Sequence, residues 1–175
     1  MAGLNISFYY GSMVRFLVLA LFFIAMPVMA AEIIIADGRW AAIRRDNGCE
    51  AAALALRPAA QGREPGRLSI VFAPKRSGEL VASFSRPVRP GSSLILTIND
   101  QPFLLIGSGD RGWSRGPAQE AAIMTALRRG GWARVESSSP QGGRMIDHYE
   151  LVGAARAIDA AALCWAVLAN QAKNR

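Results

Sequence analysis

Residues 94–106 read LILTINDQPFLLI, and this stretch decides the fold class. Two apolar runs, 94–98 and 103–106, lie on either side of the polar Asn99-Asp100-Gln101. β-Branched and large aliphatic side chains favour strands, and a short turn between two such runs favours an antiparallel pair. The stretch therefore predicts a β-hairpin.

Further strands are expected on both sides of this hairpin. Apolar and less apolar residues alternate at 68–72 and again at 80–84, which is the period of a half-buried strand. The segment CEAAALAL, 49–56, is ambiguous, because its alanines favour a helix while the turn-forming residues around it allow a strand. Other expected strands are 33–35, 40–43, 132–137 and 145–151.

Two helices are expected in the C-terminal half. Pro117 fits the first position of one helix, and Gly130-Gly131 would end it. The second has apolar residues at helical spacing, with Cys164 near its middle. The prediction is a mainly β domain, an antiparallel β-sandwich or partial barrel with two α-helices at 117–129 and 154–169.

Residues 1–30 resemble a secretory signal peptide. Arg15 is followed by the unbroken apolar run 16–26, and Val28-Met29-Ala30 has small or tolerated residues at the two positions that a signal peptidase reads. Cleavage after Ala30 would leave 31–175 as one domain, periplasmic or secreted. The alternative is a retained anchor, but the run is about half the roughly 20 residues that a membrane helix needs. The true start is either Met1 or Met13.

Cys49 and Cys164 both lie in the part expected to be exported. In an oxidising compartment two distant cysteines usually form a disulfide, and two free buried thiols are the alternative. Two cysteines and one distant histidine do not make a zinc site, so no metal and no cofactor are expected. No later segment is apolar enough to span a membrane once the leader is removed.

The chain is basic, with a formal net charge of +7, and Lys75 and Lys173 are its only lysines. The arginine bias has two explanations: the base composition of the genome, or attraction to acidic surfaces. Arg86 and Arg89 flank one expected loop. Because acidic residues are interspersed and no dense basic face is evident, nucleic acid is not an expected partner.

A second loop, 107–116 (GSGDRGWSRG), places Trp113 between Arg111 and Arg115. An aromatic side chain between two guanidinium groups can contact an anionic or aromatic partner, so this is the candidate partner-binding loop. The alternative is that Trp113 packs beneath its own loop. The other tryptophans lie in regular elements and are expected in the core. They are Trp40, Trp132 and Trp165.

Catalytic residues are not apparent. His148, the only histidine, lies between Asp147 and Tyr149 on an expected strand, where neighbouring side chains point to opposite faces. Asp147 therefore cannot orient the imidazole, and Asp147 and Glu150 make a poor acid–base pair. No nucleophile-elbow sequence is present. We expect a surface histidine and no enzymatic activity.

Several motifs follow one another in a fixed order from Leu94 onward. They are LTINDQPFLL (96–105), GDRGW (109–113), ALRRG (126–130), SSPQG (138–142) and DHYELVG (147–153), followed by Ala157 and Cys164. In order and spacing they resemble the invasion-associated locus B family of secreted proteobacterial proteins, and Trp40 and Cys49 fit the early half of that pattern. The chain departs from the family at 140–143, where members often carry an arginine-glycine-threonine run.

This resemblance implies a periplasmic or secreted, largely β domain without known cofactors or catalytic residues. The expected function is an exported binding or envelope-accessory protein that presents loops 107–116 and 137–143 to an envelope or host-surface component, with a contribution to host-cell interaction. The alternatives are a periplasmic hydrolase, or an inhibitor or chaperone-like partner of an envelope enzyme.

Overall fold

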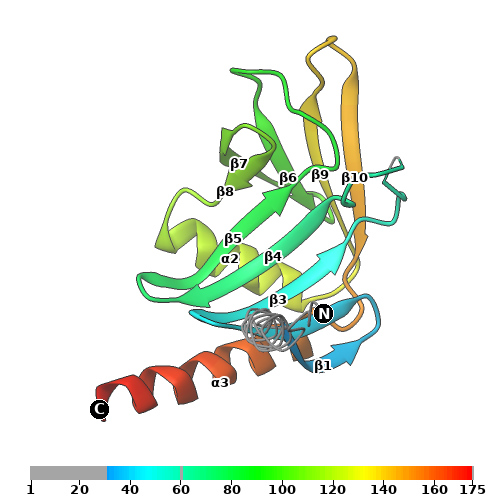
Figure 1. Cartoon of the computed structure of the whole chain (residues 1–175). Coiled ribbons are helices and arrows are strands. Elements are labelled where there is room, and N and C mark those ends of the chain that lie inside the picture. Colours follow the sequence, from blue (N-terminus) through cyan, green and yellow to red (C-terminus); the bar gives the residue numbers. More distant parts are fainter. Residues whose placement is uncertain (1–30, 60, 175) are drawn as a thin grey trace, which may run out of the picture. The chain divides into compact units, whose positions relative to one another are not determined.

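The computed structural model describes residues 31–59 and 61–174, and within them a ten-stranded antiparallel sheet curls into a half-barrel accompanied by two helices (Figure 1). The order across the sheet is β1-β2-β3-β4-β5-β8-β7-β6-β9-β10. The strands are β1 Glu32–Asp37, β2 Trp40–Arg45, β3 Gly48–Leu54, β4 Arg67–Ala73, β5 Arg76–Ser83, β6 Leu94–Ile98, β7 Gln101–Ser108, β8 Arg111–Trp113, β9 Trp132–Ser138 and β10 Arg144–Glu150. The helices are α2 Pro117–Arg128 and α3 Ala154–Lys173. The mainly β class with two helices is confirmed, while the expected signal peptide, 1–30, lies outside the described residues.

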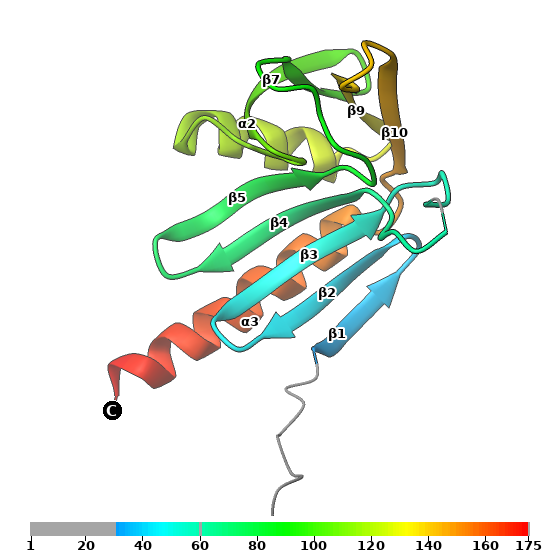
Figure 2. The same ribbon diagram turned by 45° about the horizontal axis from the view of Figure 1, so that its top comes forward.

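The ambiguous segment CEAAALAL is a strand, β3. Its side chains at Cys49, Ala51 and Ala53 are buried on one face, and α3 packs against that face. Small side chains let the helix approach the sheet closely, so tertiary packing outweighs the helical preference of alanine here. Figure 2 shows α3 lying across the strands β2 to β4.

The hairpin at 94–106 is confirmed, with β6 paired to β7 in the register Leu94↔Leu105 to Ile98↔Gln101. Its turn is only Asn99-Asp100, and Asn99 adopts a left-handed backbone with φ 51°. The turn is shorter than expected because Gln101 already pairs as the first residue of β7.

The prediction that 107–116 is a loop is wrong for residues 107–108 and 111–113, which belong to strands. β7 continues to Ser108, and β8 follows at once, pairing with β7 on one side and with β5 on the other. Gly107 and Gly112 lie opposite each other in this pairing, and Leu94 packs so closely on both that a Cβ on either would clash. Glycine has no side chain that could alternate between the two faces of a strand. These positions therefore show no strand pattern, and the sequence resembles a loop.

The sheet and the two helices enclose one core. Residues buried in it come from almost every element, and α3 contributes Ala154, Ala157, Ile158 and Ala161. The structure confirms Trp40 as core, since the residue is only 1% exposed, and Trp165 packs against the core while partly exposed. Trp132 is 57% exposed, so its expected burial is wrong; it begins β9 on the outer face, next to the buried Ala133.

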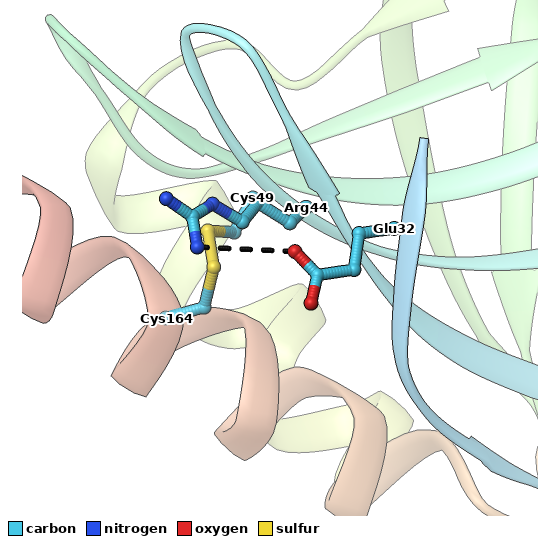
Figure 3. Close-up of a disulfide and its surroundings, with 4 residues drawn as sticks. All are labelled: Glu32, Arg44, Cys49 and Cys164. Atoms are coloured by element: carbon cyan, nitrogen blue, oxygen red, sulfur yellow. Dashed lines mark ion pairs between the residues drawn. A yellow bond between two sulfur atoms is a disulfide. The ribbon is translucent and has the colours of Figure 1, made fainter. Parts of the chain in front are cut away.

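α3 extends beyond its expected end at residue 169, to Lys173, and it is tied to the sheet by the Cys49–Cys164 disulfide (Figure 3). The two Cα atoms lie 6.1 Å apart, and the expected disulfide is confirmed. Beside it, Arg44 lies opposite Cys49 on β2 and forms an ion pair with Glu32 at 3.8 Å. No helix in the described part of the chain is both long and apolar enough to cross a membrane.

Candidate functional site

Four connections between strands meet around a surface cleft. They are the segments between β3 and β4, between β5 and β6, between β7 and β8, and between β9 and β10. The cleft has two adjoining hollows that share Arg63, Arg86 and Pro87, and we call it the arginine cleft. The first hollow, about 520 Å³, is also lined by Glu64, Phe84, Ser85, Val88, Gly109 and Asp110. The second, about 420 Å³, is completed by Ser139, Pro140 and Gln141.

Arg63 and Arg86 form no ion pair with any carboxylate of the described residues, which they share with five other arginines outside the strands and which sets them apart from the arginines within the strands. The arginines with an ion pair are Arg44, Arg45, Arg67, Arg76, Arg111, Arg128, Arg134, Arg144 and Arg156. Positive charge without a partner in a concave site attracts anions, because the walls of the cleft exclude part of the screening water. The second hollow is the more positive, since no acidic residue lines it.

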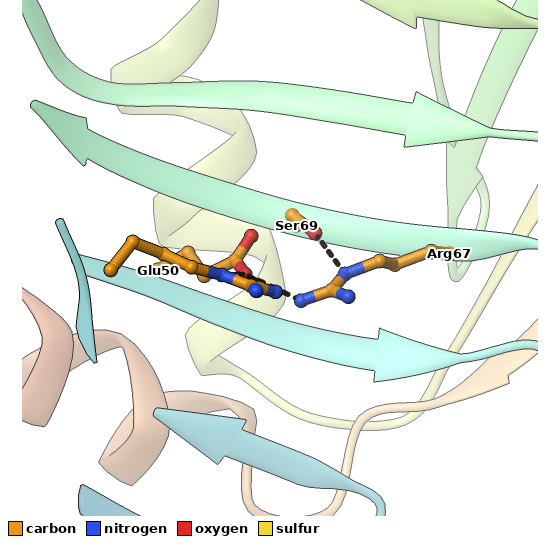
Figure 4. A network of polar contacts seen from close by, with 4 residues as sticks. Glu50, Arg67 and Ser69 are labelled. Atoms are coloured by element: carbon orange, nitrogen blue, oxygen red, sulfur yellow. Dashed lines mark hydrogen bonds and ion pairs between the residues drawn. The ribbon is translucent and has the colours of Figure 1, made fainter. Parts of the chain in front are cut away.

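An outer-face network shows how arginines are neutralised elsewhere on the sheet. Glu50 accepts from Arg45 at 2.7 Å and from Arg67 at 2.6 Å, and Arg67 also donates to Ser69 at 3.1 Å (Figure 4). These contacts join β2, β3 and β4 on the face away from α3. The guanidinium groups of Arg45 and Arg67 are therefore already paired with Glu50, whereas those of the cleft have no ion pair with a described carboxylate.

The walls of the cleft are tied together by main-chain hydrogen bonds. Arg89 N–H donates to the carbonyl of Ser138 at 2.8 Å, which joins the β5–β6 connection to the end of β9. Ser139 N–H donates to the Gly143 carbonyl at 2.7 Å, and Ser139 Oγ accepts from Gly143 N–H at 3.0 Å. The Ser139 hydroxyl thus keeps its own proton available to donate.

A buried polar pair lies between two of the segments that line the cleft. Asp147 and Tyr149 occupy alternate positions of β10, so both point to the inner face, where they are 3% and 1% exposed. Asp147 Oδ2 and the Tyr149 hydroxyl have no hydrogen-bond partner among the described residues. Gly66 packs against both, and a Cβ at Gly66 would clash with the Asp147 carboxyl.

The surroundings of this pair shift both pKa values upward. Burial raises the pKa of the Asp147 carboxyl above its ordinary value, and the nearby charges of Arg86, Arg57 and His148 offset only part of that rise. Burial, with a smaller contribution from Asp147, also raises the pKa of Tyr149.

Arg111, Trp113 and Arg115 do not line the arginine cleft. Arg111 and Trp113 share one face of β8, where Trp113 is partly buried between Val81 of β5 and Ile106 of β7. Arg115 lies beyond the strand, and its N–H donates to Gln119 Oε1 at 2.7 Å. Trp113 therefore lies beside strand residues of the sheet. Of the predicted loop 107–116, only the turn Gly109-Asp110 lines the cleft.

The sequence pointed to part of the cleft. It marked Arg86 as flanking a loop and 137–143 as a presented loop, and both line the second hollow. It gave no reason to join them to Arg63, because the β3–β4 connection carries no motif. The inward position of Asp147 was implied by strand alternation, but its burial beside Arg86 depends on the curl of the sheet.

No histidine lines the cleft within the described residues, and its acidic lining residues are Glu64 and Asp110. His148 is exposed on the outer face of β10, opposite to Asp147, as strand alternation predicts. No group of three or more histidine, cysteine, aspartate or glutamate side chains in residues 31–59 and 61–174 could hold a metal ion. The lining residues offer carboxylates in the first hollow and, in the second, positive charge with hydrogen-bond donors.

The comparisons with known proteins leave the site to be interpreted on its own geometry. No family model, no curated protein and no solved structure matches the chain at a significant level.

Proposed function

We propose that the chain is an exported, non-catalytic binding or envelope-accessory protein of the invasion-associated locus B type, and that the arginine cleft takes up its partner. Export follows from the leader-like residues 1–30 and is consistent with the Cys49–Cys164 disulfide, since disulfides persist mainly outside the cytosol. The partner is an envelope or host-surface component, and the protein contributes to contact with host cells through it.

One observation carries the binding role: four connections joined by main-chain hydrogen bonds surround Arg63 and Arg86, which form no ion pair with a described carboxylate. An unpaired guanidinium on a fixed loop loses little conformational freedom when it binds, so more of the interaction energy appears as affinity. The exposed position of His148, away from Asp147, supports a role without catalysis.

Affinity capture from envelope extracts tests the proposal. The bait is the domain 31–175 with its disulfide formed, and the cleft variant is the double substitution R63Q/R86Q. The matched control is R39Q/R129Q, which removes the same charge from two exposed arginines that line neither hollow and make no ion pair with a described carboxylate.

We expect one envelope component to be retained by the unaltered bait and by R39Q/R129Q, and lost with R63Q/R86Q. Recovery of nothing above a basic protein of equal net charge would contradict a binding role. Labelling of the purified protein by an active-site probe, or loss of a hydrolytic activity in H148A with unchanged stability, would favour the hydrolase instead.

A further inference from the structure

We propose that the second hollow of the arginine cleft is a binding site for a phosphomonoester group, held between Arg63 and Arg86. This inference rests on the proposed binding function and names the chemistry of the ligand. The same group occurs on a lipid headgroup and on a soluble phosphorylated saccharide, and the experiment below separates the two.

The charges around the second hollow favour a dianion. Arg63 and Arg86 both line it, and no acidic side chain does. Asp110, in the adjoining hollow, is engaged by Arg111 at 3.9 Å, and Glu64 is exposed there. A phosphomonoester carries a charge of about −1.5 to −2 near neutral pH, which matches two guanidinium groups.

The buried carboxyl group of Asp147 does not form an ion pair with Arg86. Asp147 is 3% exposed on the inner face of β10, and Arg86 has no ion pair with it or with any other described carboxylate. Arg57 also acts on Asp147 from the β3–β4 connection, so the carboxyl faces more than one guanidinium. The guanidinium of Arg86 is therefore free to pair with an anion bound in the hollow.

The number of hydrogen-bond donors favours phosphate over carboxylate. Four of the residues that line the second hollow have side chains able to donate hydrogen bonds: Arg63, Arg86, Ser139 and Gln141. A carboxylate offers two oxygens with about four acceptor positions, whereas a phosphomonoester offers three strong acceptor oxygens. Guanidinium groups also bind phosphate oxygens in pairs, which fixes the orientation of the anion.

The hollow is held in shape before any ligand arrives. Pro87 and Pro140 restrict the backbone on opposite walls, and Ser139 is bonded across its turn to Gly143. The adjoining hollow shares Arg63, Arg86 and Pro87 and provides about 520 Å³ for the group that carries the phosphate. The site therefore has room for a phosphate together with its attached body.

Calorimetric titration of the disulfide-bonded domain 31–175 with inorganic phosphate, at pH 7 and low ionic strength, tests the site. Loss of charge-assisted hydrogen bonds predicts affinity about tenfold weaker or worse in R63Q/R86Q. The control R39Q/R129Q should stay within about twofold, because only distant screening changes. Circular dichroism and thermal unfolding establish that each variant is folded.

Two further arms identify the source of the phosphate. Glucose 6-phosphate presents the group in solution, and vesicles containing phosphatidic acid present it on a lipid. Binding of either, weakened in R63Q/R86Q and kept in R39Q/R129Q, supports the site and names its source. Equal weakening in both variants, or no phosphate binding by the folded domain, overturns it.

Failure of the phosphate site is distinguishable from failure of the proposed function. If the domain binds none of these phosphates but still captures an envelope component through Arg63 and Arg86, the cleft binds a partner and the ligand class is wrong. If neither phosphate nor any envelope component is bound, both proposals fail.

Discussion

The indole N–H of Trp40 donates a hydrogen bond to the main-chain carbonyl of Glu150 at 3.0 Å, across 110 positions of sequence. Trp40 begins β2, near one edge of the sheet, and Glu150 ends β10, the opposite edge. A second bond, from Leu56 N–H to the His148 carbonyl at 2.9 Å, joins the same regions. These contacts hold the curl that brings β10, with Asp147, beneath the segments that line the arginine cleft.

Replacing Trp40 with Phe removes this hydrogen bond while keeping an aromatic ring in the core. Because the Glu150 carbonyl loses its buried partner, we expect the free energy of unfolding to fall by about 1–3 kcal/mol. Urea denaturation measures the change. Trp132→Phe is the control, since Trp132 is largely exposed and should shift stability by less than about 0.5 kcal/mol.

The disulfide contributes stability by shortening the unfolded chain. C49A/C164A should lower the free energy of unfolding by about 2–5 kcal/mol, because the bond closes a loop across 115 positions. Guanidinium denaturation of the variant is compared with that of the reduced parent protein, which should unfold at a similar midpoint. A variant as stable as the oxidised parent would mean that α3 stays on the sheet without the bond.

Gly66 has no room for a side chain because Asp147 and Tyr149 press against it. G66A should destabilise the fold by about 1–3 kcal/mol through overpacking. In a D147A background the same substitution should cost less, since the clashing carboxyl is gone. A double-mutant cycle by thermal unfolding measures this coupling, and equal costs in both backgrounds would place the strain elsewhere.

Stability should depend on the ionisation of Asp147. Burial raises its pKa in the folded protein above the ordinary value of 3.8, so the folded state binds the proton more tightly than the unfolded state. The native protein therefore loses stability as pH rises from about 3.8 through the folded-state pKa.

The variant D147N lacks that loss. It should be more stable than the parent at pH 7 and lose this advantage at pH values below the unfolded-state pKa. Thermal unfolding across the pH range measures the difference between the two proteins. An advantage of the same size at every pH would contradict a raised pKa for Asp147.

Local patterns predicted most of the fold but not the site. The alternation at 68–72 and 80–84, the hairpin at 94–106 and the Pro117 helix start each depend on neighbouring residues, and the structure has them all. β8 could not be found in this way, because its three residues derive their pairing from β5 and β7, far away in sequence.

The arginine cleft depends on the curl of the sheet. Arg63 and Arg86 lie on connections that the sequence marks only as loops, and they meet because β3, β5 and β9 end near one another. The buried position of Asp147 follows the same geometry, since strand alternation gives its face but not what covers it. The disulfide was predictable, because cysteine count and the leader-like segment both point to it.

The disulfide joins β3 to α3, and we propose that the domain it closes is exported. Intact-mass spectrometry of the protein purified from its native cells, with and without reduction before alkylation, tests it most directly. We predict a chain that begins at Ala31 and takes up alkylating reagent at Cys49 and Cys164 only after reduction. Two reactive thiols in the unreduced protein, together with an uncleaved leader, would contradict the account.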